Sequence, residues 1–272
     1  MKRLLAVFCT LIVAARLPAW AGSEQNRQAQ FEPQQIATFA KQVEQYAAGQ
    51  GAHAFIIARV GRPAEDLPEG IRFTHTAIAV YSMIETASGE KLPGYAIHNL
   101  YQYADSPERS KLVIDYPVDF FWGVQSLEAG IIIPKPALQK RLVNLIASGA
   151  NQQLHNPSYS VIANPFDLTY QNCTEHTLDL LNAAIYQTED RGQLKANAKA
   201  HFQPQAVAAS RFKLMLGSWL MADVETSDHG DQVATATFST IGQYLLDYGL
   251  AQQAVIMTEQ GTTQPLLDAP LI

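Results

Sequence analysis

The sequence contains very little cysteine. Its 272 residues include only Cys9 and Cys173, and Cys9 lies in an N-terminal segment that we expect to be removed. A mature chain with one cysteine cannot form an intramolecular disulfide, although exported proteins usually carry cysteines in pairs. Cys173 is therefore either a buried, small apolar residue or a nucleophile that is kept for its chemistry.

Long hydrophobic runs are also missing after the first segment, so we expect no membrane-spanning helix in the mature chain. Residues 1–21 have the pattern of a signal peptide, in which a basic start precedes an apolar run from Leu4 to Ala15. Cleavage is expected after Ala21, which makes the protein periplasmic or secreted. A retained membrane anchor is the alternative, but the run is shorter than the roughly 20 residues that cross a bilayer.

An excess of positive charge is absent as well. Removing Lys2, Arg3 and Arg16 with the signal peptide leaves 16 basic residues against 25 acidic ones, a net charge of about −9. This balance argues against nucleic acids and anionic membrane surfaces as partners. Internal repeats and low-complexity tracts are lacking too, which favours an ordinary globular domain.

The spacing of apolar residues predicts a flexible N-terminal tail over 22–32 and a single α+β domain over 33–272. Residues 188–203 are expected to be a surface connection, and the ambiguous segment 233–247 is expected to return as a strand. Helices are predicted over 33–49, 136–148, 172–186 and 204–216, and strands over 54–60, 73–84, 95–101, 112–118, 129–133 and 254–258.

Cys173 is predicted to lie in the first turn of a helix. Asn172 is a good N-cap residue, and Glu175 completes an Asn variant of the capping box. Backbone N–H groups at such a position favour an anion and could hold a developing oxyanion. The carboxylate of Glu175 works against this, because a nearby negative charge raises the pKa of a thiol.

The candidate base is His75, which begins an otherwise apolar strand. A histidine within hydrogen-bond reach can take the thiol proton and later give it to the leaving group. Strand alternation places His75, Ala77 and Ala79 on one face. We expect these small alanines to leave room for the helix that carries Cys173. The alternative is a structural histidine that is buried in the core.

The third candidate orients the base. His98 ends the next strand-like run. In a hairpin with the strand that contains His75, His98 would lie beside His75 and fix the tautomer of that imidazole. Asn99 is the alternative orienting residue. A surface histidine at a strand end would explain His98 equally well.

Other polar residues are weaker candidates for a functional site. His176 could form a metal pair with Cys173, but neither a Cys-x-x-Cys nor a His-Glu-x-x-His pattern accompanies it. We therefore expect no metal and no cofactor. Arg59 and Arg62 could bind a carboxylate or phosphate, but two arginines beside a turn are expected at the surface.

This order of residues resembles the circularly permuted papain-like proteins, which include relatives of lecithin–retinol acyltransferase and NlpC-type bacterial hydrolases. The matching residues are His75, His98 and Asn172-Cys173, within a core of about residues 52–187. The resemblance implies an antiparallel sheet packed against a nucleophile-bearing helix. Residues 188–272 would be a C-terminal extension of extra helices and strands without a counterpart in the acyltransferases.

The chain as a whole more closely resembles an exported bacterial family that is described only as a domain of unknown function. The segments that carry this likeness are Phe73-Thr74-His75, Ala96-Ile97-His98-Asn99-Leu100 and Tyr170-Gln171-Asn172. This second resemblance covers about residues 30–260, and it implies no activity.

The leading hypothesis is an exported thiol hydrolase or acyltransferase that acts on an amide or ester in the cell envelope, through Cys173, His75 and His98. Export favours a cell-wall peptide as the substrate, and the acyltransferase resemblance favours a lipid ester. A non-catalytic protein that binds a peptide or lipid on the same scaffold is the alternative. A redox or metal sensor that uses the lone thiol is a third option.

Overall fold

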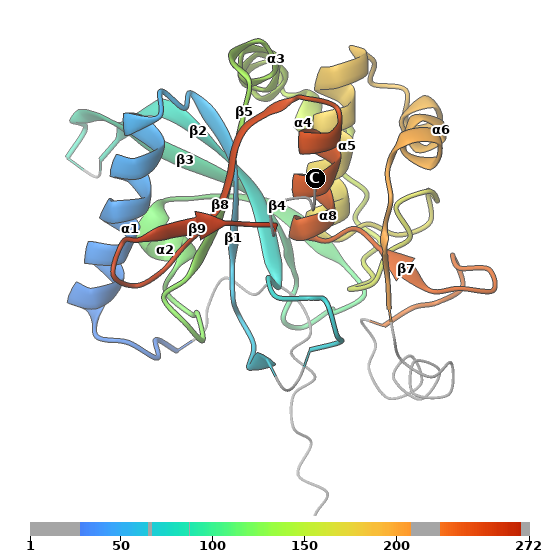
Figure 1. The fold of residues 1–272 in the computed structure, drawn as a ribbon, viewed down its shortest axis with the longest axis horizontal. Helices are drawn as coiled ribbons and strands as arrows, with labels where there is room; N and C mark the ends of the chain where they lie inside the picture. Colours follow the sequence, from blue (N-terminus) through green and yellow to red (C-terminus); the bar gives the residue numbers. More distant parts are fainter. Residues whose placement is uncertain (1–27, 65–66, 87, 208–223, 268–272) are drawn as a thin grey trace, which may run out of the picture.

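The structure is a computed structural model that describes residues 28–64, 67–86, 88–207 and 224–267. The expected signal peptide, residues 1–21, lies outside the described residues. Within the described ranges, seven strands form one antiparallel sheet with helices on both faces (Figure 1). The strand order is β4-β3-β2-β1-β5-β8-β9. This arrangement confirms the predicted α+β class.

The strands of the sheet are β1 Ala54–Arg59, β2 His75–Glu85, β3 Lys91–Gln102, β4 Ser110–Asp115, β5 Ala129–Pro134, β8 Ala251–Met257 and β9 Thr263–Pro265. A separate two-stranded pair is formed by β6 Gln205–Ala206 and β7 Ala234–Thr235. The helices are α1 Pro33–Gly49, α2 Pro117–Phe120, α3 Pro136–Ala147, α4 Ala150–Gln153, α5 Cys173–Tyr186, α6 Arg191–His201 and α8 Phe238–Asp247.

Alternation along β2 assigns its side chains to two different cores. Ala77 and Ala79 belong to the core that includes Phe39 of α1, on one face of the sheet. Ile78 belongs to the other core, with Leu178 of α5 and residues of α3, α6 and α8. The expectation that the helix bearing Cys173 packs on the alanine face is therefore wrong. The alanines accommodate α1, and α5 packs on the aliphatic face.

The segment 188–203, predicted to be a surface connection, contains α6. Asp190 caps this helix, because its carboxylate accepts a hydrogen bond of 2.9 Å from the N–H of Gln193. Leu194 and Ala198 are buried in the core beside α5. Only two apolar residues anchor α6, so its amphipathic pattern was too weak to predict a helix.

The C-terminal part differs from prediction at three points. Residues 205–206 form strand β6 where a helix over 204–216 was predicted, and residues 208–216 lie outside the described residues. The predicted strand 233–247 is mostly helix α8, which Thr237 caps through a 3.2 Å bond from Thr240. The strand predicted over 254–258 is confirmed as β8, which pairs with β5. Strands β8 and β9 of this part therefore complete the central sheet.

Helix α8 lies very close to β5. A Cβ atom on Gly130 would lie 2.4 Å from the ring of Phe238, at the first residue of the helix. Only glycine permits this approach, which lets Phe238 fill the core beneath α8. Among the described residues, we find no helix that is long and apolar enough to cross a membrane.

The two histidine strands pair as a hairpin, as predicted. Their antiparallel register runs from Glu85 opposite Lys91 to Ile78 opposite His98. The connection is therefore shorter than the gap between the predicted strands 73–84 and 95–101. Beyond the Ile78–His98 pair this ladder stops, and the first residues of β2 pair with β1 while the last residues of β3 pair with β4. The candidate site lies at this end of the sheet.

Candidate active site

Cys173 occupies the first position of α5, as predicted. Asn172 caps the helix, because its Oδ1 accepts hydrogen bonds from the N–H groups of Thr174 at 3.0 Å and Glu175 at 2.9 Å. The Nδ2 of Asn172 donates to the carbonyl of Val161 at 3.0 Å, which ties the helix start to the preceding loop. The thiol is thus held at an electropositive helix terminus.

The thiol packs against the beginning of β2. The hydroxyl of Thr174 donates a 3.2 Å hydrogen bond to that of Thr76, which directly follows His75. Burial raises the pKa of Cys173, and the backbone N–H of Thr76, the Thr174 hydroxyl and the Arg59 guanidinium partly offset this rise. The resting side chain at neutral pH is therefore a thiol, and attack on a carbonyl would require a base.

His75 is held by Asn99. The Nε2 of His75 lies 2.8 Å from the Oδ1 of Asn99, and both side chains are buried. The Nδ2 of Asn99 donates to the carbonyl of Ile97 at 2.9 Å, which fixes the amide so that its oxygen faces the imidazole. The proton of neutral His75 is therefore on Nε2, and Nδ1 is the nitrogen that can accept a proton.

His98 lies elsewhere. It pairs with Ile78 rather than with His75, and it lines a separate cavity of about 230 Å³ together with His176 of α5. Burial lowers its pKa. The register explains the difference, because neighbouring residues of a strand point to opposite faces. Asn99, the alternative orienting residue, is the one that the structure brings to His75.

Aromatic rings and a buried ion enclose the imidazole. The ring of Tyr101 stacks on His75 with centroids 4.9 Å apart and planes 12° apart, and Phe120 lies at 5.6 Å. The hydroxyl of Tyr101 donates to Asp115 at 2.5 Å. The guanidinium of Arg59 lies over both rings and donates to the Phe120 carbonyl. Arg59, expected at the surface, is only 5% exposed.

These contacts place the imidazole on the α1/α2 side of β2, whereas α5 packs on the opposite side. The thiol is nevertheless near the His75 end of the strand, because Thr174, the neighbour of Cys173, bonds to Thr76 and the backbone N–H of Thr76 faces the sulfur. The ladder between β2 and β3 has already ended there, and the first residues of β2 pair with β1 instead.

Glu175 does not complete the predicted capping box. Its carboxylate instead forms a buried ion pair with Lys195 of α6, and the same ammonium contacts Asp179 at 3.0 Å. All three side chains are at most 6% exposed. Lys195 therefore compensates the negative charge that would otherwise oppose a thiolate at Cys173. Sequence reasoning missed this residue because it treated residues 188–203 as a surface segment.

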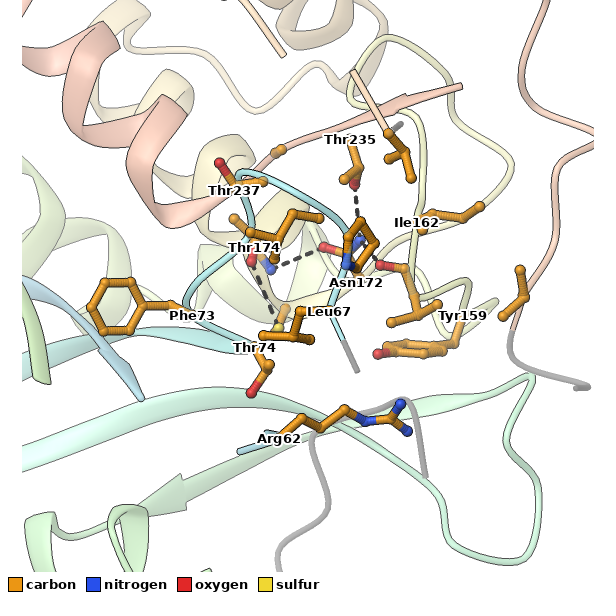
Figure 2. Close-up of a pocket in the computed structure, with 17 residues that line it drawn as sticks. Arg62, Leu67, Phe73, Thr74, Tyr159, Ile162, Asn172, Thr174, Thr235 and Thr237 are labelled. Atoms are coloured by element: carbon orange, nitrogen blue, oxygen red, sulfur yellow. Dashed lines mark hydrogen bonds between the residues drawn. The ribbon is translucent and has the colours of Figure 1, made fainter. Parts of the chain in front are cut away.

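A cavity of about 220 Å³ opens beside Cys173 (Figure 2). Phe73 and Thr74 line it from the segment before β2, and Tyr159 and Ile162 line it from the loop before α5. Apolar side chains form most of its wall. Among the described residues, we find no group of three or more His, Cys, Asp or Glu side chains with the arrangement of a metal site.

Comparison with known proteins assigns a family. A family model described as "Uncharacterized protein conserved in bacteria (DUF2145)" matches residues 46–245. The chain belongs to the DUF2145 family. No curated protein and no solved structure matches this DUF2145 chain. The match confirms the predicted kinship with a bacterial family of unknown function, and it includes His75, Asn99 and Cys173.

Proposed function

We propose that this DUF2145 protein is a thiol-dependent hydrolase or acyltransferase that acts on an amide or ester. The observation that carries the proposal is the hydrogen bond between His75 Nε2 and Asn99 Oδ1. It lies at the beginning of β2, where Thr174, the neighbour of Cys173, bonds to Thr76. This bond leaves Nδ1 as the basic nitrogen. The apolar cavity beside the thiol provides space for a substrate.

In the proposed reaction, Cys173 Sγ attacks the substrate carbonyl carbon while His75 Nδ1 takes the thiol proton. The N–H of Cys173 at the helix start helps to hold the oxyanion. The tetrahedral intermediate then collapses, the carbon–nitrogen or carbon–oxygen bond breaks, and His75 gives its proton to the leaving amine or alcohol.

The thioester that remains is attacked by water in a hydrolase, or by a second alcohol or amine in a transferase. His75 takes a proton from that nucleophile, the carbon–sulfur bond breaks, and the proton returns to the sulfur. Atoms and charges balance over the two half-reactions without an external cofactor. Because the thiol is protonated at rest, proton transfer accompanies attack on the carbonyl.

The finer assignments also belong to this proposal. We propose a circularly permuted papain-like arrangement in which Asn99 takes the orienting role that was predicted for His98. We also propose export by the segment 1–21 and an acyl ester, amide or peptide substrate in the cell envelope. The chain order of His75, Asn99 and Cys173 and the helix-start thiol support the first assignment. The composition of residues 1–21 supports the second.

The test is alkylation of Cys173 by a fluorescent iodoacetamide at pH 7.5, combined with hydrolysis of p-nitrophenyl butyrate. We expect Cys173→Ala to abolish both signals. His75→Ala and His75→Gln should each slow hydrolysis by at least a hundredfold, because general-base catalysis contributes about 10²–10⁴-fold. The matched control is His53→Ala, an exposed histidine that precedes β1.

Circular dichroism must show that the variants are folded. Hydrolysis and labelling that ignore both His75 substitutions in folded protein would refute the proposed catalysis.

One observation favours a second function, a non-catalytic protein that binds an apolar ligand. His75 is only 1% exposed and Cys173 only 5%, so both side chains could be structural. In that case Cys173→Ser would retain ligand binding, and the parent protein would show no turnover.

A further inference from the structure

The cavity beside Cys173 has the composition of a binding site for an apolar group. Its volume of about 220 Å³ exceeds that of an apolar cavity of about 150 Å³ that accepts benzene in another protein. The wall is formed mainly by aliphatic and aromatic side chains, among them Leu67, Ile71, Phe73, Tyr159, Val161 and Ile162.

The polar part of the wall is confined to a few positions. Hydroxyls of Thr74, Thr235 and Thr237 lie among the lining residues, and Arg62 is the one charged side chain among the described residues of this wall. Carboxylates are lacking from the same lining set. Such a wall offers little to the several charges of a cell-wall peptide, and it favours a ligand that gains by leaving water.

The position of the thiol decides which part of a substrate the cavity would hold. Cys173 and its neighbours Asn172 and Thr174 are themselves part of the wall, so a carbonyl that the sulfur attacks lies at the cavity surface. The acyl group stays bound to sulfur through both half-reactions, whereas the leaving group departs after the first. An apolar site next to the sulfur is therefore best used by the acyl group.

We propose that this cavity binds the apolar acyl group of the substrate, so that the enzyme acts on esters or amides of aliphatic acids longer than acetate. The inference rests on the proposed thiol chemistry and adds the substrate class to it. An aliphatic chain and the side chain of an apolar aminoacyl residue share this chemistry, and the experiment separates the two sources.

The experiment measures kcat/KM for the p-nitrophenyl esters of acetate, butyrate, hexanoate and octanoate. Each buried methylene contributes about 0.8 kcal/mol, which is about a fourfold gain. We expect a gain of about two-hundredfold from acetate to hexanoate, followed by a plateau once the cavity is full. The p-nitrophenyl ester of N-acetyl-leucine is measured beside them. An advantage of the leucine ester over hexanoate assigns the peptide source, and the reverse assigns the fatty acyl source.

Two variants test whether the gain comes from this cavity. Val161 packs in the small cluster that contains Cys173, so Val161→Phe should lower kcat/KM for hexanoate at least tenfold more than kcat/KM for acetate. The matched control is Ile114→Phe, on the edge strand β4, where the side chain is 57% exposed. It should leave the ratio of the two substrates unchanged.

Binding without turnover separates failure of this inference from failure of the proposed function. In Cys173→Ala, octanamide at ten times its Kd should raise Tm by about 4 °C, and acetamide should not.

Equal turnover of acetate and hexanoate esters would overturn the inference while the thiol chemistry stands. A preference for octyl acetate over octanoate esters would overturn it as well, because the apolar group would then be the leaving group. Stabilisation by octanamide without any Cys173-dependent turnover would refute the proposed catalysis and leave only an apolar binding cavity.

Discussion

His176 is a histidine that folding keeps uncharged. Burial lowers its pKa from 6.5 to about 3, and the neighbouring His155, Arg191 and His98 act in the same direction. Its Nδ1 is buried and has no hydrogen-bond partner within the described residues. Replacement by an apolar residue therefore sacrifices little at high pH, and it removes a group that must gain a proton when the protein unfolds in acid.

The size of the effect follows from the two pKa values. Between pH 6.5 and about 3 the unfolded chain binds a proton at this position and the folded chain does not, so falling pH lowers the free energy of unfolding. The loss is about 2 kcal/mol at pH 5 and about 3 kcal/mol at pH 4, with a limit of about 5 kcal/mol. Above pH 6.5 this contribution disappears.

Urea denaturation of the parent and of His176→Leu at pH 8, 6, 5 and 4 measures this contribution. The two proteins should have similar stability at pH 8, and the variant should be more stable by about 2 kcal/mol at pH 5. With an m-value of about 3 kcal/mol per M, this difference moves the urea midpoint by about 0.7 M. The control is His53→Gln, whose imidazole is exposed. A difference between parent and His176→Leu that is independent of pH would show that burial does not lower the pKa of His176.

Three further predictions concern the thiol and its supports. Asn99→Ala should lower kcat for p-nitrophenyl butyrate by about tenfold or more with little change in KM, because His75 loses the partner of its 2.8 Å bond. An equal loss with Asn99→Asp would argue against an orienting role. The rate of Cys173 alkylation should increase with pH up to and beyond pH 9.0, since burial raises the pKa of this thiol. A plateau of the rate below pH 7 in stopped-flow labelling would contradict this prediction. Lys195→Met should reduce the free energy of unfolding by about 3–5 kcal/mol, because it leaves Glu175 without its buried partner. Chemical denaturation of this variant and of Lys195→Met/Glu175→Gln measures the coupling. A double variant no more stable than the single one would refute the prediction.

Local signals were sufficient for much of the fold up to residue 186. The helix over 33–49 has its apolar residues at helical spacing between Pro33 and the glycines at its end, and the structure confirms it as α1. The N-cap residue Asn172 likewise predicts the start of α5 correctly without reference to any tertiary contact. In both cases the deciding residues are neighbours in the sequence.

The C-terminal part could not be predicted in the same way, because tertiary contacts decide its structure. Helix α6 is held by the buried charge of Lys195 and by two apolar residues. Helix α8 has a composition rich in β-formers, and its position depends on the close approach of Phe238 to Gly130 of β5. Neither contact leaves a periodic pattern in the sequence.

The residues of the candidate site were predicted better than their arrangement in space. Composition and strand signals identified Cys173, His75 and the pair His98–Asn99. The choice within that pair depends on which neighbour shares the face of His75. The choice of sheet face for α5 depends on where α1 packs. Both are set by distant segments, so alternation alone could not decide them.

The pairing of β8 with β5 has a practical consequence for anyone who trims the chain to its family boundaries. A fragment of residues 46–245 would begin near the end of α1 and would lack the strand that covers the outer side of β5. Main-chain amides and carbonyls of an apolar strand would then face solvent, which is the template on which further copies add. Such a fragment should precipitate or self-associate, and expression that retains residues 33–267 avoids this outcome.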